Sequence, residues 1–339
     1  MGSKKEIALY YPYIDIDDGG LIKTAALYWD ELQTIVPESV LCPYESPISR
    51  EATDSGFLKP RKVNPEDESV KKTGDEFCAD IEQDNIKQNV ITGIRKVKRK
   101  RFSRIHFEKW APDSLFKVWQ AIKNDIPLSP DIDDYVIFPE PLGNAYMSRL
   151  ASVIAQKDKT TPLTNLPAFQ DILIDRFINY EEETQAELAK LSLQTVRINR
   201  KVPLINILHF RDNHRKELLS FRRAIRKLSR QIGTGLNTAK RQQKFQEIIK
   251  DEVLPSRQEI EAKLSERDIA FGFSALDITQ ATLMGAIASQ WENLLAGVGG
   301  GLISLTISLV RSLWEDRNII KGHPLGYLYR AHKKFGAKK

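Results

Sequence analysis

The chain contains the four residues DIDD at two places, and both copies are rich in carboxylates. The first copy contributes Asp15 and Asp17, and the second contributes Asp131 and Asp133. Carboxylate oxygens are the ligands that Mg²⁺ and Ca²⁺ prefer, so these four aspartates form one candidate metal site. A calcium loop that starts at Asp15 is excluded, because Ala26 stands where such a loop needs a bidentate glutamate.

The same aspartates have a plainer interpretation as capping and turn residues. Asp17 and Asp18 precede a predicted helix, where a carboxylate accepts hydrogen bonds from free backbone N–H groups. Asp131 follows Ser129 and Pro130, a setting typical of turns. We favour capping and turns, expect no cofactor, and keep a magnesium site as the alternative.

Other motifs that would define a reaction are missing from the sequence. The five histidines form no HExxH motif, and the chain has no GxSxG, no GxxxxGK[ST] and no CxxC. The sequence therefore assigns no catalytic residue and favours a protein that is not an enzyme.

Positive charge is concentrated in a few segments, although the net charge of the chain is only +6. The segment 201–246 holds twelve basic residues and two acidic ones. Seven cations of its central helix form a candidate surface for nucleic acid or for an acidic partner: Arg215, Lys216, Arg222, Arg223, Arg226, Lys227 and Arg230. Such a surface binds phosphates by releasing counterions. Pairing with an acidic helix of the same chain, such as 179–190, remains the alternative.

This central helix is predicted over Arg215–Ile232 by its apolar residues. These recur at intervals of three and four: Leu218, Phe221, Ile225, Leu228 and Ile232. The spacing is that of one buried stripe, and we expect the cations to lie away from it. The stripe is too short for a free coiled coil, so the helix is expected to pack in a bundle.

A glycine-rich apolar helix is predicted at about 283–316. Its segment 293–310 carries no charge and would span about 27 Å as a helix, close to the thickness of a bilayer core. A polar stripe through Ser304 and Ser308 argues against a membrane span, so we favour contact with other helices or with a second copy. The expected contact residues are Gly297, Gly301, Ile303, Ile307, Val310 and Trp314. Membrane insertion remains the alternative.

The apolar patterns predict an α+β protein that is mainly α. Strands are expected at Ile7–Ile14, Phe57–Pro65, Arg101–Trp110 and Tyr135–Pro141, the second near a sheet edge because of its proline. One helix is predicted from Leu21 to Val36, where Pro37 stops it, and a polar helix is predicted over 66–92. We expect a small α/β unit with a mixed sheet over 1–142, followed by a helical bundle over 143–339. Two cysteines and an N-terminus without a signal-peptide pattern favour the cytoplasm.

The opening IALYYPYI…LIKTAALYWDELQTIVP resembles the start of a bacterial domain family of unknown function. Its members begin with a YYP strand and continue with a LYWD…IVP helix. Later segments are similar to further landmarks of that family: GFLKPRKVNP, AYMSRLA, FRDNHRKELLSFRRAIRKL and SQWENL. The resemblance implies a bacterial cytosolic protein with one integrated architecture and gives no catalytic residue.

Members of this family belong to the accessory part of bacterial genomes, which makes phage defence one expected setting. Together with the residue patterns, the resemblance leads us to expect a non-enzymatic scaffold or sensor that binds a protein partner or a second copy. Nucleic-acid binding and a membrane-active effector are the alternatives.

Overall fold

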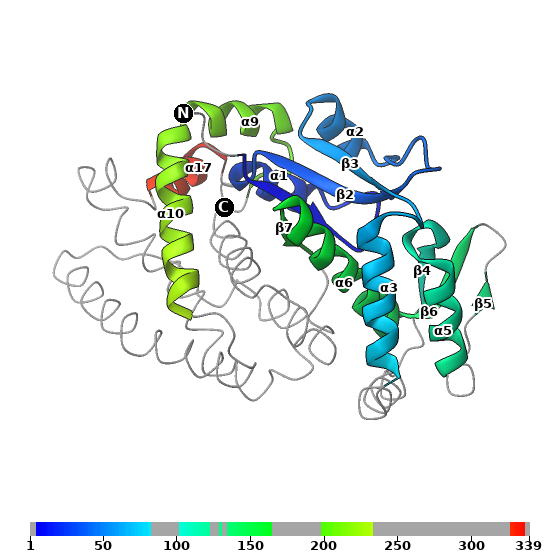
Figure 1. Cartoon of the computed structure of the whole chain (residues 1–339). Coiled ribbons are helices and arrows are strands. Elements are labelled where there is room, and N and C mark those ends of the chain that lie inside the picture. The colour runs from blue at the N-terminus through cyan, green and yellow to red at the C-terminus, as the bar shows by residue number, and fades with distance from the viewer. Residues whose placement is uncertain are drawn as a thin grey trace, which may run out of the picture. The chain divides into compact units, whose positions relative to one another are not determined.

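The computed structural model describes residues 5–82, 102–122, 129–130, 134–164, 198–232 and 326–335 (Figure 1). Contacts divide the chain into two units, the first formed by Met1–Asp17 and Asp30–Asn179, the second by Asp18–Trp29 and Tyr180–Lys339. The change expected near residue 142 falls inside the first unit. The reason is that β7 (Thr161–Leu163) pairs with β1 (Ile7–Tyr10) at the start of the chain.

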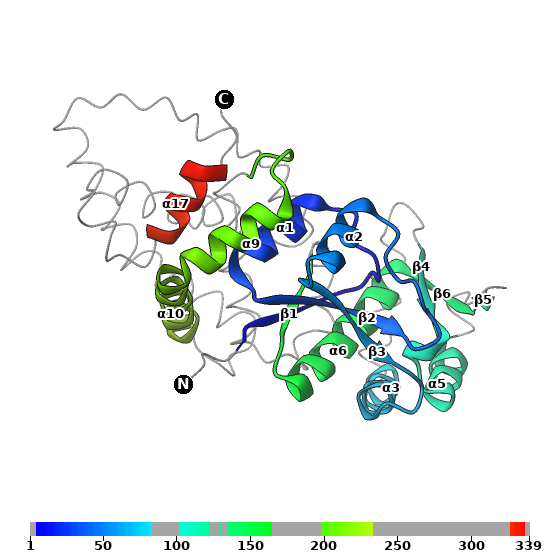
Figure 2. The ribbon, with the colours of Figure 1, turned by 90° about the horizontal axis from the view of Figure 1, so that it is seen from above.

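A parallel sheet forms the centre of the first unit. It contains β1, β7, β2 (Glu31–Pro37) and β3 (Leu58–Val63) in the order β3-β2-β1-β7 (Figure 2). In this register Leu9 lies opposite Gln33 of β2 and Pro162 of β7. The chain first adds strands on one side of β1 and later returns to its other side. The strand order therefore reverses at β1, as in doubly wound α/β sheets.

The residues Glu31–Pro37 correct one expectation from the sequence. We predicted a helix from Leu21 to Val36, but α1 (Gly19–Tyr28) ends at Tyr28 and a strand follows. The ELQTIVP segment contains three consecutive β-branched residues and is buried along nearly its whole length. Parallel strands are covered on both faces, so their residues do not alternate between apolar and polar. Without this alternation, the apolar residues of such a strand can match the spacing of a helix by chance.

A second, antiparallel sheet belongs to the same unit. It has the order β4-β6-β5 and contains β4 (Phe102–His106), β6 (Tyr135–Pro139) and β5 (Ser129–Pro130). The strands predicted near 101–110 and 135–141 are confirmed, and so is the edge position of β3 in the described sheet. The chain is α+β as expected, with parallel and antiparallel pairs lying in two sheets.

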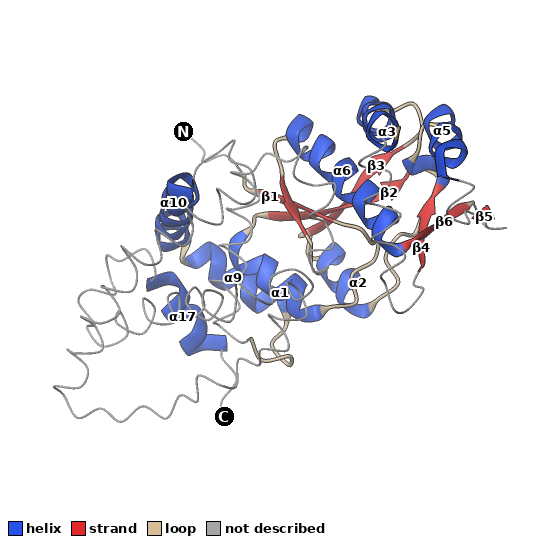
Figure 3. Ribbon diagram, turned by 90° about the horizontal axis from the view of Figure 1, so that it is seen from below, coloured by secondary structure: helices blue, strands red, loops and turns tan. Residues whose placement is uncertain are grey.

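Four described helices complete the first unit: α2 (Pro47–Asp54), α3 (Glu68–Ile81), α5 (Pro112–Ile122) and α6 (Glu140–Asp158). Helices α3 and α6 lie on one face of the parallel sheet and α2 on the other (Figures 1 and 3). Between the helices and the sheets lies a buried core with stacked aromatic rings. The Trp110 ring stacks on Tyr146 with centroids 3.4 Å apart and on Phe138 at 5.1 Å. Tyr146 comes from the AYMSRLA segment.

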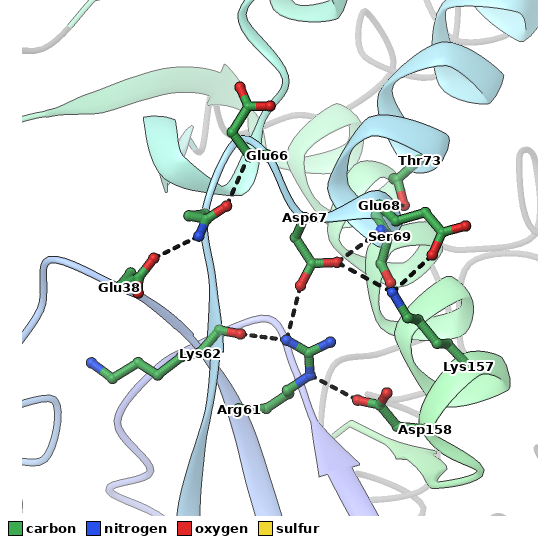
Figure 4. A network of polar contacts seen from close by, with 11 residues as sticks. Glu38, Arg61, Lys62, Glu66, Asp67, Glu68, Ser69, Thr73, Lys157 and Asp158 are labelled. Atoms are coloured by element: carbon green, nitrogen blue, oxygen red, sulfur yellow. Dashed lines mark hydrogen bonds and ion pairs between the residues drawn. The ribbon is translucent and has the colours of Figure 1, made fainter.

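Ion pairs join the helices and the edge strand. Arg61 of β3 donates to Asp158 at the end of α6 (Nε to Oδ2, 2.7 Å) and to Asp67 before α3 (Nη1 to Oδ2, 3.0 Å), as Figure 4 shows. Burial alone would raise the pKa of Asp67, but the backbone N–H of Ser69 and the Arg61 guanidinium outweigh it, so the pKa is lowered. The carboxylate therefore stays charged and caps α3.

Gly74 marks the closest approach between α3 and α5. A Cβ atom added there would lie 2.6 Å from the Cβ of Ser114. We predict that Gly74→Ala destabilises the protein, because overpacking costs about 1–3 kcal/mol and alanine regains only about 1 kcal/mol as the better helix former. Urea denaturation of Gly74→Ala, Ser114→Gly and the double variant measures this. The two changes should offset each other, and strictly additive losses would contradict the close approach.

Candidate anion-binding interface

The described helices of the second unit are α1, α9 (Leu204–Asn213), α10 (Arg215–Ile232) and α17 (Gly326–Phe335). Their core contains buried aromatic rings. Phe221 of α10 lies 5.7 Å from the Tyr28 ring of α1 and 6.2 Å from the Tyr327 ring of α17. The predicted helix 215–232 is confirmed, and its stripe residues Leu218, Phe221 and Ile225 are buried. The structure does not describe the side chains of Leu228 and Ile232.

Three long side chains bind the C-terminal end of α1. Arg211 Nη1 donates to the Trp29 carbonyl at 2.8 Å, Arg222 Nε to the Tyr28 carbonyl at 2.9 Å, and Tyr327 Oη to the Leu27 carbonyl at 2.7 Å. The last carbonyls of a helix lack intrahelical partners and carry the negative end of its dipole. Helix α1 has no basic residue of its own in its last turn. We call Arg211, Arg222 and Tyr327 the α1 cap.

Arg222 corrects a second expectation. We placed it with the exposed cations, but it is fully buried. The reason lies in the spacing: Arg222 is four residues after Leu218 and three before Ile225, so it shares their face of the helix. Its guanidinium also lies over the Tyr28 ring, 5.4 Å from the centroid. The sequence contains this spacing, but a positively charged side chain is normally predicted to be exposed to solvent.

The other cations of α10 lie outside this core. Lys216, Arg223, Lys227 and Arg230 are exposed, whereas Arg215 and Arg226 are half-buried. Four side chains, at relative positions i, i+3, i+4 and i+7, line a hollow of about 380 Å³: Arg223, Arg226, Lys227 and Arg230. We call this feature the cationic hollow. Its volume lies within the range of small-ligand sites, roughly 300–1,000 Å³.

Helix α10 itself supplies no acidic residue beside the cationic hollow. Glu217 is the only acidic residue of this helix, and it lies in the first turn, with Oε1 3.8 Å from Arg330 Nε. Like charges three or four residues apart destabilise a helix by about 0.2–0.5 kcal/mol per pair. The four cations form four such pairs, and any anionic group close to them relieves this repulsion.

Of the four aspartates of the candidate metal site, the structure describes only Asp15 and Asp17. Asp15 accepts hydrogen bonds from the backbone N–H groups of Glu45 and Ser46, and Asp18 caps α1 by accepting from Gly20 and Leu21. The capping role is thus confirmed for Asp18, whereas no cap bond is found for Asp17. Asp131 and Asp133 lie outside the described residues. Within those residues, no three His, Cys, Asp or Glu side chains come close enough to hold a metal ion.

The predicted glycine-rich helix at 283–316, with Gly297, Gly301, Ile303, Ile307, Val310 and Trp314, lies outside the described residues. The SQWENL segment lies there too. Among the helices that the structure describes, none combines the length and the apolar character needed to cross a bilayer.

A model of a protein family of unknown function matches residues 144–336, more than half of the chain. The chain belongs to this family, DUF6236. The match includes all three members of the α1 cap but not α1 itself, which precedes it. Neither the curated proteins nor the solved structures compared with this DUF6236 protein include a match. An activity therefore has to be inferred from the geometry.

Arg222 and its neighbour Arg223 allow a matched test of the α1 cap. We predict that Arg222→Met lowers the free energy of unfolding by about 2–3 kcal/mol, because it removes a charged donor from a buried carbonyl. Arg223→Met changes an exposed residue of the same helix and should stay within about 0.5 kcal/mol of the unmodified protein. Urea denaturation compares the two, and equal losses would show that the cap contributes nothing specific.

Proposed function

We propose that this DUF6236 protein is a non-enzymatic interaction protein that binds nucleic-acid phosphates through the cationic hollow. The observation that carries the proposal is the hollow itself, in which four cations of one helix face the same space. A hollow lined by cations raises the local concentration of anions and speeds their association.

The spacing and the residue types favour phosphates over carboxylates. Arg223 and Arg230 are seven residues apart, or about 10.5 Å along the helix axis, so the hollow extends along α10 beyond the reach of one anion. Three of the four lining cations are arginines, and a guanidinium binds phosphate through two parallel hydrogen bonds. Duplex DNA offers a negative charge about every 1.7 Å, which supplies several partners at once.

This binding is expected to be independent of base sequence. The described lining of the hollow contains only Arg and Lys side chains. Contacts to phosphates fix the position of a nucleic acid, whereas base edges and stacking on aromatic rings would be needed to read it.

The wider expectations remain proposals. A role as scaffold or sensor in a bacterial accessory system such as phage defence is compatible with a nucleic-acid ligand. Self-association through the glycine-rich segment and an acidic protein partner are the other proposals. An acidic occupant of the hollow from the chain itself, such as the segment 179–190, would compete with nucleic acid.

Fluorescence anisotropy with labelled duplex DNA across a salt series tests the phosphate contacts. Each lost phosphate contact should reduce the slope of log K against log salt by about 0.9. We predict that Arg223→Gln combined with Lys227→Gln reduces this slope by about 1.8 and weakens binding to unrelated sequences equally.

Lys216→Gln serves as the control, because Lys216 is an exposed cation of the same helix that does not line the hollow. It should leave the slope nearly unchanged. Absence of DNA binding at low salt would refute the proposal. If polyglutamate bound through the hollow and DNA did not, the partner would be an acidic protein.

A further inference from the structure

The small antiparallel sheet of the first unit has one face in the core and one face outside it (Figure 3). Ile105 of β4 lies opposite Val136 of β6, and both pack in the core. Helix α6 covers this face closely, because a Cβ atom added at Gly143 would lie 2.7 Å from the Cβ of Ser103. Side chains alternate between the two faces of a sheet, so the residues in between point to the other side.

The outer face carries aromatic and apolar side chains where polar ones are expected. By the register, β4 and β6 contribute the following residues to it: Phe102, Arg104, His106, Tyr135, Ile137 and Pro139. An antiparallel sheet with one face in solvent normally has polar side chains on that face. Phe102 is nevertheless 52% exposed, and Phe107, which follows β4 directly, is 41% exposed. Neighbouring exposed apolar side chains of this kind mark interaction sites.

Arg104 adds a cation to this apolar surface. The residue is exposed, and its guanidinium lies over the Tyr135 ring, with Cζ 4.6 Å from the centroid. His106 packs against the same ring from the side, with the centroids 5.1 Å apart. A guanidinium held in this way provides a flat charged group that stacks on bases and donates hydrogen bonds to phosphates. We call Phe102, Arg104, Tyr135 and Ile137 the sheet platform.

The sequence that leads into β4 is strongly basic. Six of the seven residues 95–101 are lysine or arginine, and residue 101 is bonded directly to Phe102. This segment lies outside the described residues, but its charge is fixed by the sequence. A second copy of the chain would bring the same charge and be repelled, whereas a polyanion would be attracted.

We propose that the sheet platform binds single-stranded nucleic acid by stacking on its bases. An exposed aromatic ring beside cations is the combination that binds single strands, because the ring stacks on a base and the cations neutralise the phosphates. The bases of a duplex are already stacked on one another and do not reach such a ring. The sheet platform therefore selects unpaired nucleotides, whereas the cationic hollow of α10 contacts phosphates alone.

Stacking and charge have different effects on a salt series. We predict that Phe102→Ala weakens the binding of labelled oligothymidylate at least about fivefold. The slope of log K against log salt should stay unchanged, because the loss of a stacked base releases no counterion. Arg104→Gln should instead reduce this slope by about 0.7, the value for one phosphate contact to a single strand. Fluorescence anisotropy measures both quantities.

Two further variants serve as controls for the ring. Phe102→Tyr keeps an aromatic ring at the same position and should bind nearly as well as the unmodified protein. Phe116→Ala removes a side chain that is 59% exposed on α5, outside the sheet platform, and should leave the affinity unchanged. Equal losses in Phe102→Ala and Phe116→Ala would overturn the proposal, and so would the absence of oligothymidylate binding at low salt.

Duplex DNA separates this site from the cationic hollow. Phe102→Ala should leave duplex binding unchanged, whereas Arg223→Gln combined with Lys227→Gln should weaken it. A protein that binds oligothymidylate through Phe102 but binds no duplex would support the sheet platform and refute the cationic hollow. Light scattering of Phe102→Ala provides the last check. If this variant turned a dimer into a monomer, the outer face would pack against a second copy and the proposal would be wrong.

Discussion

The hydrogen bonds at the C-terminal end of α1 join all four described helices of the second unit. A helix of ten residues is marginal by itself in water, and α1 provides no cation for its own last turn. Arg211, Arg222 and Tyr327 supply the missing donors from three other helices. Because Arg222 is held at the Tyr28 carbonyl, the rotation of α10 about its own axis is fixed. Arg223, Lys227 and Arg230 must then point away from the core, so the same contact that stabilises α1 also presents the cationic hollow.

In the first unit, a stack of buried aromatic rings holds the backbone beside it. Tyr146 packs its ring on Trp110 and holds the carbonyl of Lys109 with its hydroxyl group. Lys109 is 3% exposed, because its backbone is held against this buried stack. In both units a tyrosine hydroxyl thus donates to a backbone carbonyl, Tyr146 to that of Lys109 and Tyr327 to that of Leu27.

The sequence predicted the elements that obey local rules and missed those that depend on packing. Three features could be predicted because each depends on residues close in the sequence. The apolar stripe of α10 follows from its periodicity, the edge position of β3 from its proline, and the cap of α1 from Asp18. The strand Glu31–Pro37 was read as a helix because its burial on both faces removes the alternation that marks a strand. The burial of Lys109 was not predicted, because it becomes apparent only from the packing of Trp110 and Tyr146. The spacing of Arg222 indicates that it lies on the buried face of α10. We predicted it to be exposed because charged side chains usually lie in solvent.

The α1 cap also has a consequence for how the chain is made. Its bonds join residues that are 182, 194 and 300 positions apart in the sequence. Protein synthesis proceeds from the N-terminus, so the end of α1 leaves the ribosome long before Arg211 and Arg222 are translated, and Tyr327 is translated later still. In the nascent chain, the carbonyls at the end of α1 and the Tyr28 and Trp29 rings therefore lack these partners. The α1 cap can be completed only after Tyr327 has been translated, and until then a chaperone could protect the LYW segment.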